Sequence, residues 1–222
     1  FAAAKNKPAP AQGDALELAR LLNPEDLMLA VGARSFDQAF DKGMAGEGGG
    51  EAIEKEYPGL VAELRQATRE VTLADMKADM PAIHRRYARL FAESFTTEEL
   101  AELVAFYKSP AGLRIIKAKF ANLDVSGMVD RFGEDPDAKM TASDVDAIND
   151  GATSGLLKDM SAEDFQAMLM FGLRPVGRKL RSVTPRIAEI EAEIANEPDP
   201  ELDSAIEEAS RKVYERHGLG DR

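Results

Sequence analysis

The chain contains no cysteine, and this absence excludes several kinds of chemistry at once. Disulfide bonds, thiolate zinc sites and a cysteine nucleophile all need that side chain. A cysteine-free chain suits an oxidising compartment, although many cytosolic proteins also lack cysteine. Histidine is nearly as scarce, because only His84 and His217 are present. A metal site built from several histidines is therefore close to excluded.

Long hydrophobic runs are also missing. The longest uncharged stretches, such as residues 165–173, fall well short of the roughly 18 residues that span a bilayer. We therefore expect a protein that is not transmembrane. The hydrophobic content of 44% and the charged content of 31% are ordinary for a folded soluble protein of 222 residues. The net charge of −12 argues against a nucleic-acid partner, because a duplex repels an acidic surface.

One stretch of the chain occurs twice. Residues 95–112 read FTTEELAELVAFYKSPAG and align without a gap on residues 160–177, which read MSAEDFQAMLMFGLRPVG. Each position of the second stretch lies 65 residues after its counterpart, so that Phe106 matches Phe171 and Pro110 matches Pro175. Most other pairs keep their apolar or polar character. The pattern predicts an internal repeat of one helical unit.

Both copies carry the signals of two short helices joined by a bend. Residues 96–99 and 161–164 have the pattern of capping boxes at a helix start. About eleven residues later, Ser109-Pro110 and Arg174-Pro175 start a new helix or kink the old one, because proline cannot donate the helical hydrogen bond. A glycine two residues after each proline lets two backbones approach closely.

The remaining chain also shows helical spacing, and convincing strand alternation is absent. The five glycines of residues 43–50 predict a loop, and Pro81 is expected to end or kink a helix. His84, flanked by two arginines, is expected at the surface.

The predicted fold is an all-α helical bundle with two related three-helix units, packed about a pseudo-twofold axis, plus N- and C-terminal helices. The expected segments are a flexible leader at 1–13, an N-terminal helical segment at 14–44, repeat units at 51–133 and 141–196, and a C-terminal helix at 201–217. We expect them to form one compact structural domain.

Residues 95–112 resemble the signature of the bacterial "domain of unknown function 2059" family: an acidic helix start, Phe-Tyr, Ser-Pro-x-Gly and a basic helix. The second copy departs from that signature, with Gly172 in place of Tyr107 and Arg174 in place of Ser109. The resemblance implies an exported helical protein of Gram-negative bacteria and implies no activity.

The first residues, FAAAKNKPAPAQ, are small, proline-containing and unpatterned. They suggest a flexible start left after a signal peptide has been removed, or a chain trimmed at this point. With the family resemblance, we expect an exported, periplasmic protein.

The residues shared by the two copies have two interpretations. Tyr107 and Ser109 could form a polar pair beside a groove. The alternative, which we favour, is structural: a core aromatic, a helix cap and a bend explain every residue type in the motif, namely Phe106, Tyr107, Ser109, Pro110, Gly112, Phe171, Pro175 and Gly177. No histidine or lysine is spaced to activate Ser109, so we predict no catalytic, metal or cofactor residues.

The second helix of each copy is basic, which stands out in an acidic protein. The residues with the strongest claim to a cationic surface are Arg114, Lys117, Arg174, Arg178 and Arg181. Such a surface would bind an anionic envelope component: a lipid headgroup, a cell-wall polymer or an acidic protein. The alternative is that these side chains pair with the acidic first helices of the same chain.

The sequence thus predicts a non-enzymatic binding or interaction module of the bacterial envelope. The second hypothesis is a periplasmic carrier or chaperone-like protein, with an apolar groove for lipid or unfolded polypeptide. A hydrolase is disfavoured, because no nucleophile–base or metal constellation is visible.

Overall fold

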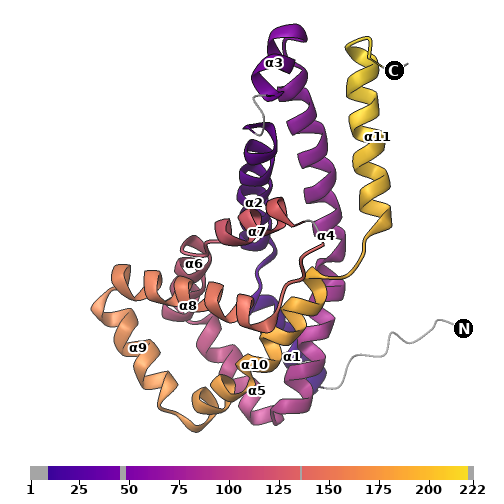
Figure 1. Ribbon diagram of the computed structural model, residues 1–222. Coiled ribbons are helices and arrows are strands. Elements are labelled where there is room, and N and C mark those ends of the chain that lie inside the picture. Colours follow the sequence, from indigo (N-terminus) through magenta and orange to yellow (C-terminus); the bar gives the residue numbers. More distant parts are fainter. Residues whose placement is uncertain (1–9, 46–48, 136, 220–222) are drawn as a thin grey trace, which may run out of the picture. The chain divides into compact units, whose positions relative to one another are not determined.

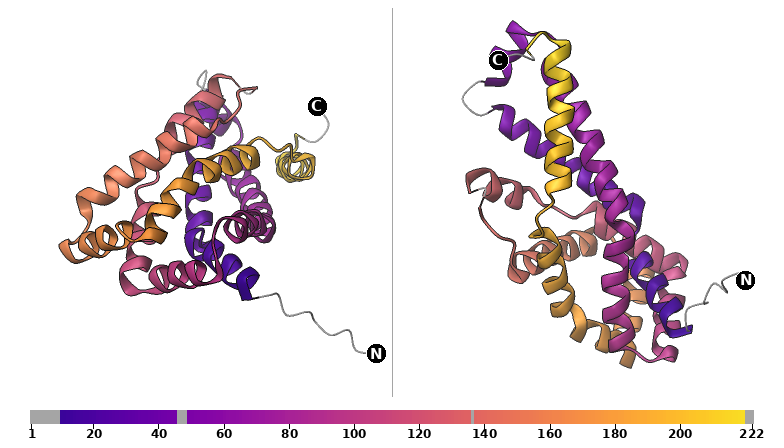
Figure 2. Two further views of the ribbon diagram at one scale, coloured as in Figure 1. Left: turned by 90° about the horizontal axis from the view of Figure 1, so that it is seen from below. Right: turned by 90° about the vertical axis from the view of Figure 1, so that its right-hand side faces the viewer.

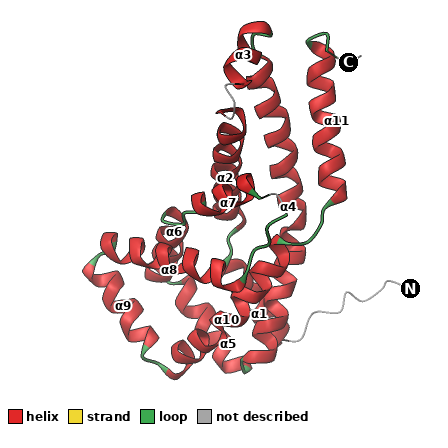
Figure 3. Cartoon of the chain, in the orientation of Figure 1, coloured by secondary structure: helices red, strands yellow, loops and turns green. Residues whose placement is uncertain are grey.

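The computed structural model of the protein describes residues 10–45, 49–135 and 137–219. In these ranges the chain is helical and contains no strand, so the all-α prediction is confirmed (Figure 3). In chain order the helices are α1 (Pro10–Leu22), α2 (Glu25–Ala45), α3 (Gly49–Glu56), α4 (Leu60–Ser94), α5 (Thr97–Lys108), α6 (Pro110–Ala121), α7 (Ser126–Glu134), α8 (Ala142–Asp159), α9 (Ala162–Gly172), α10 (Pro175–Ala195) and α11 (Pro200–Arg216). Most of the predicted leader, residues 1–9, lies outside the described residues.

The chain divides into two compact units. Unit 1 comprises the described residues up to Leu27 together with Met80–Leu123 and Met140–Ala195. Unit 2 comprises the described residues of Met28–Asp79, of Asp124–Lys139 and of the chain from Asn196 onward. Helices α2 and α4 each contribute residues to both units. The predicted segment boundaries, and the prediction of one compact structural domain, stay predictions.

Unit 1 is built around a well-packed apolar core. Helix α1 packs along α5, and the side chains of Leu18, Phe91, Leu100 and Leu103 are fully buried between the helices. In the other part of the unit, the consecutive helices α8, α9 and α10 are arranged like the three sides of a triangle, as Figures 1 and 2 show. Burial of large apolar side chains is the main stabilising contribution to such a bundle.

Local side-chain bonds set where the helices of unit 1 begin. Thr96 accepts a hydrogen bond from the backbone N–H of Glu99, whose carboxylate accepts one from the Thr96 N–H, which completes a capping box. Thr141 and Asp144 form the same box at α8. At α9, Ser161 caps the N–H of Asp164, but the Asp164 carboxylate is held by an arginine instead.

The bend between α5 and α6 is centred on Ser109, which is both the last cap of one helix and the first cap of the next. Its hydroxyl donates to the carbonyl oxygen of Phe106 at 2.6 Å and accepts from the N–H of Gly112 at 3.1 Å. Pro110 then opens α6, where its missing N–H costs nothing.

Three local expectations differ from the structure. Helix α4 does not end at Pro81, so of the two outcomes expected there, the end of a helix is wrong. The glycine-rich stretch is helical at both its edges, since α2 reaches Ala45 and α3 begins at Gly49, and residues 46–48 lie outside the described residues. His84 is buried, with only 6% of its surface exposed, and its Nε2 lies 2.8 Å from the carbonyl oxygen of Asn23. His84 is therefore buried next to the end of α1, although two arginines follow it in the sequence.

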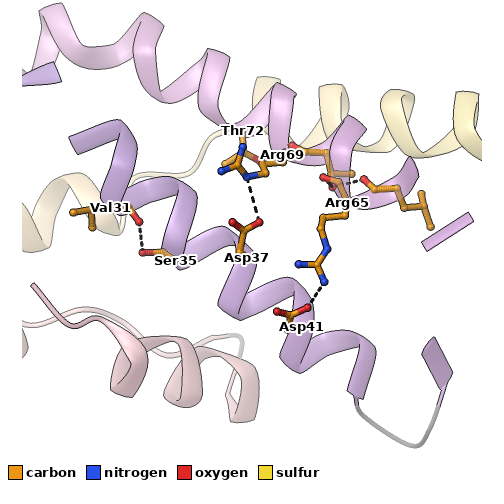
Figure 4. Close-up of polar contacts among 9 residues, drawn as sticks. Val31, Ser35, Asp37, Asp41, Arg65, Arg69 and Thr72 are labelled. Carbon is orange, nitrogen blue, oxygen red and sulfur yellow. Dashed lines mark hydrogen bonds and ion pairs between the residues drawn. The ribbon is translucent and has the colours of Figure 1, made fainter. Parts of the chain in front are cut away.

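Unit 2 is held by polar contacts as well as a small core. Asp37 and Asp41 of α2 form ion pairs with Arg69 and Arg65 of α4, at matching four-residue spacings (Figure 4). Helix α11 runs antiparallel to the first part of α4 (Figure 1), and Arg216 bonds the Glu63 carboxylate at 3.1 Å. Leu60 and Leu64 of α4 bury their side chains against Val213 of α11.

Candidate functional site

Unit 1 contains a groove of about 600 Å³ whose lining comes from seven helices, including the last residue of α1, Leu22. Apolar side chains of α4, α5, α6, α8, α9 and α10 form most of its surface: Tyr87, Phe91, Phe106, Ile115, Ile116, Leu156, Met168, Leu169, Phe171, Leu180 and Ile187. Its volume lies in the range of small-molecule and peptide sites. This groove is the candidate functional site.

The groove lies where the two similar stretches of the chain meet. Phe106 and Phe171 stack face to face, with ring centroids 3.7 Å apart and planes inclined by 3°. Further pairs of positions that are 65 residues apart also line the groove together, among them Tyr107 and Gly172, Ile115 and Leu180, Ile116 and Arg181, and Lys119 and Thr184. Three of these pairs join unlike residues, so the two sides of the groove differ chemically.

Ion pairs at this junction are reciprocal. Arg114 of α6 bonds the Asp164 carboxylate in the first turn of α9, with a shortest contact of 2.6 Å. Lys179 of α10 bonds the Glu99 carboxylate in the first turn of α5, also at 2.6 Å. Lys179 is the counterpart of Arg114, and Asp164 is the counterpart of Glu99. Each basic helix, α6 or α10, therefore pairs with the acidic first turn of a helix from the other copy.

These contacts lower the pKa of both carboxyl groups. The hydrogen bond from Arg114 lowers the pKa of Asp164, and the bond from Lys179 lowers that of Glu99, each against the opposing effect of burial. Only 10% of the Asp164 side chain is exposed, whereas 52% of Arg114 is exposed. Asp164 and Glu99 therefore have a structural role: they join the helical hairpin α5–α6 to the hairpin α9–α10.

The other basic residues of the predicted cationic surface also have contacts inside unit 1, with one exception. Arg174 pairs with Glu102 at 3.1 Å. Arg178 and Arg181 donate to the Leu173 and Gly172 carbonyl oxygens, which the end of α9 leaves without helical partners. Lys117 is exposed and has no ion-pair partner among the described residues. These contacts match the intramolecular alternative, and binding of an anionic partner stays a prediction.

A polar cluster lies on one side of the groove. The Tyr87 hydroxyl donates to one oxygen of Glu191 at 3.0 Å, and the Asn149 amide donates to the other at 3.3 Å. Burial, reinforced by the Glu191 charge, raises the pKa of Tyr87 well above its ordinary value. Burial lowers the pKa of Lys119, and the same Glu191 charge partly opposes that shift.

Two further carboxylates face the groove from α8. Asp146 and Asp150 lie one helical turn apart on the same helix and both line the groove. Neither has an ion-pair partner among the residues that the structure describes. With Glu191, they give one side of an otherwise apolar groove a net acidic character.

The part of the lining that comes from α9 and its C-cap is apolar and open to solvent. Leu169 and Leu173 line the groove yet keep 49% and 56% of their surface exposed. Phe165, one turn earlier on α9, is 45% exposed and continues the same stripe. Such a stripe is typical of a surface that another apolar group covers.

Tyr107 also faces the groove. Burial raises its pKa to about 12, so the hydroxyl stays protonated at neutral pH. Across from it, the counterpart Gly172 has no side chain. The departure of the second copy from the first at this position was the one sequence signal that could have pointed to the groove.

The buried or hydrogen-bonded polar groups of the groove include Glu191, Tyr87 and Tyr107. Glu191 has a donor on each oxygen. Burial raises the pKa of both tyrosines, so their hydroxyls stay protonated at neutral pH. Among the described residues, one set of three carboxylates could approach a cation, namely Asp75, Asp79 and Asp199, and it belongs to unit 2. Asp199 there already caps α11 by accepting from the Leu202 N–H.

No described helix combines the length and the apolar character that crossing a bilayer requires. No curated protein and no solved structure matches the chain. Residues 81–120 match the family model described as "Uncharacterized protein conserved in bacteria (DUF2059)", which confirms the resemblance seen in the sequence. The match covers the second part of α4 with α5 and most of α6, and so contains the side of the groove that carries Tyr107 and Lys119.

Proposed function

We propose that unit 1 is a non-enzymatic binding module whose groove receives the apolar part of an amphipathic partner. The observation that carries this proposal is the open groove of about 600 Å³, with an apolar floor and a half-exposed leucine wall on α9. An unoccupied surface of this kind leaves apolar area in water, and covering it with a partner is favourable. The apolar groove is the feature that the carrier or chaperone-like hypothesis needs.

We also propose that the hairpins α5–α6 and α9–α10 are two copies of one unit related by a pseudo-twofold axis. The reciprocal ion pairs and the stacked Phe106–Phe171 pair support this relation, because a twofold arrangement brings equivalent residues together and exchanges unlike ones. A groove at such a junction becomes asymmetric when one copy diverges. This accounts for an acidic and an apolar side on one site.

The remaining part of the proposal is where the protein is located in the cell and which kind of component it binds there. The bacterial family match and the absence of cysteine support an exported, periplasmic protein of a Gram-negative bacterium that binds an envelope component. Release of the native protein by osmotic shock, together with a periplasmic marker, tests this location. Recovery with the cytosolic fraction would contradict it.

Binding to the groove is tested with N-phenyl-1-naphthylamine, an uncharged apolar probe whose fluorescence rises on burial. The chain contains no tryptophan, so the probe signal has no indole background. We expect the wild-type protein to bind it and the double variant Leu169→Glu/Leu173→Glu to lose at least about tenfold in affinity, because two charges then line the apolar wall.

The matched control is Leu113→Glu/Leu157→Glu. These leucines are 52% and 43% exposed and also belong to unit 1, but neither lines the groove. Both double variants change the same residue types at sites of similar exposure, so a general effect on folding or solubility appears in both. Equal loss in the two variants, or no binding by the wild type, refutes the proposed function.

A further inference from the structure

The charge of the groove, which rests on the proposed function above, indicates what kind of partner it takes. Three carboxylates line it, those of Asp146, Asp150 and Glu191, against two cations. One cation, Lys119, is attracted by the charge of Glu191. The other, Arg181, donates a hydrogen bond to the Gly172 carbonyl oxygen. The two α8 carboxylates are left without ion-pair partners among the described residues. Their charges are therefore available to a cationic group of a partner.

The spacing of these groups matches a helix. Asp146 and Asp150 lie four residues apart on α8, so they present two negative charges about 6 Å apart in a row. Lysine or arginine side chains four residues apart on a second helix would have the same spacing. The apolar stripe of Phe165, Leu169 and Leu173 runs along α9 to its C-cap, and the eight steps from the first to the last residue span about 12 Å at 1.5 Å per residue.

The openness of the wall favours a polypeptide helix over a single alkyl chain. Sites that bind small apolar molecules cover most of the ligand's surface. Leu169 and Leu173 instead remain about half exposed at the groove's edge. A helix about 10 Å wide can lie along such an edge, with its apolar face on the wall and floor and its other face in water.

We propose that the groove binds an amphipathic polypeptide helix that carries lysine or arginine along one edge of its apolar face. The apolar face contacts the leucine wall of α9 and the floor around Phe106. The basic edge meets Asp146 and Asp150 on α8. The protein's net charge of −12 adds a general attraction for such a partner.

The test uses the full chain and two synthetic helical peptides of about 18 residues, roughly 27 Å long, with the same leucine face. One peptide carries lysine along both edges of that face and the other carries glutamate. Fluorescence anisotropy of a labelled peptide measures each dissociation constant. We expect the lysine peptide to bind about tenfold more tightly than the glutamate peptide, with a difference that shrinks as salt is added.

Variants locate the effect. Asp146→Asn/Asp150→Asn should weaken binding of the lysine peptide about fivefold or more and should not weaken binding of the glutamate peptide, because the substitutions remove an attraction in the first case and a repulsion in the second. Asp159→Asn is the control for removing a carboxylate from α8, because Asp159 is exposed on the same helix and does not line the groove. Circular dichroism at 222 nm verifies that each variant is folded.

The outcomes separate this inference from the proposed function. If the apolar probe binds but the two peptides bind equally, or the asparagine variants have no effect, the basic-helix partner is excluded and the groove remains a binding site. If neither peptide binds while laurate displaces the probe, the occupant is a lipid chain and the inference is overturned. If the probe itself does not bind in the groove, the proposed function fails.

Discussion

At the scale of single residues, Gly112 and Gly177 have the least room for a side chain among the described glycines. A Cβ atom on Gly112 would lie 2.2 Å from the carbonyl oxygen of Phe106, and one on Gly177 would lie 2.3 Å from that of Phe171. In each case the obstacle is backbone at the end of the preceding helix, which cannot rotate out of the way. The two bends therefore require glycine for close approach and not for unusual dihedral angles.

We expect Gly112→Ala and Gly177→Ala each to destabilise the protein by about 1–3 kcal/mol, because the added methyl group forces the two backbones apart. Gly151→Ala is the control: this glycine lies inside α8 with nothing within 4 Å of a Cβ. That change should stabilise the protein by about 0.5–1 kcal/mol through helix propensity. Urea denaturation measures all three. An alanine at position 112 or 177 that stabilises the chain would contradict the steric argument.

The Arg114–Asp164 pair predicts how stability depends on pH. Because Arg114 lowers the pKa of Asp164 in the folded chain below its ordinary value of 3.8, unfolding at acidic pH takes up a proton. The pair's contribution is therefore complete above pH 3.8 and is lost as the pH falls through the folded-state pKa. Lys179 and Glu99 contribute in the same direction, below the ordinary value of 4.5 for Glu99.

Asp164→Asn tests this dependence. We expect the variant to have a lower urea midpoint than the wild type at pH 7, and the difference to shrink as the pH falls below 3.8. The exposed Asp159→Asn variant should follow the wild type throughout. A gap between Asp164→Asn and the wild type that stays constant down to pH 2.5 would show that the substitution acts through packing and not through charge.

At the scale of elements, the two hairpins of unit 1 are joined by the stacked rings of Phe106 and Phe171. We expect Phe106→Leu and Phe171→Leu to be non-additive, with a coupling free energy of about 0.5–1.5 kcal/mol, because each change removes the same ring contact. A second double-mutant cycle on Phe106 and Phe95, whose rings are not in contact, should give coupling near zero. Urea denaturation of the five variants (three single and two double, since Phe106→Leu is shared) and of the wild type measures both cycles. Equal coupling in the two cycles is the result that the stacking argument forbids.

Elements whose signals are local were predictable from the sequence. Thr96 and Thr141 cap their helices with a carboxylate three residues on, and Pro110 and Pro175 open the next helices. All of these interactions join residues that are close in the chain, so the pattern of residue types is enough to reveal them. The same holds for the absence of strands in the described residues.

The groove and its polar cluster were not predictable in this way. Tyr87 and Glu191 are 104 residues apart, and Asn149 and Glu191 are 42 apart, so no periodicity connects them. His84 failed for the same reason, because its partner carbonyl is 61 residues away. Its arginine neighbours point to other faces, since consecutive helical residues are turned by about 100°. Tertiary packing determined each of these side chains.

At the scale of the whole molecule, the two units differ in how their helices are buried. In unit 1, α4 places Tyr87, Leu90 and Phe91 in a large core, each 3% exposed or less. In unit 2, α2 contains no buried residue, and the core around Leu60 and Leu64 is completed mainly by partly buried side chains. Less apolar burial means a smaller free energy of opening, so the units should differ in local stability.

Helix α4 allows this difference to be measured within one continuous element, because its residues 60–79 belong to unit 2 and residues 80–94 to unit 1. In hydrogen–deuterium exchange, we expect amides of 62–79 to exchange at least about tenfold faster than those of 83–94, with α11 exchanging at the rate of the faster part. Backbone hydrogen bonding is the same along the helix except at Pro81, which has no N–H to donate. That gap affects only the turn around it, so propensity alone would give similar protection on both sides of the proline, with fraying at both ends. A rate that changes near residue 80 requires two cooperative units that share one helix, whereas equal protection from 64 to 90 would mean that the chain opens as a single unit.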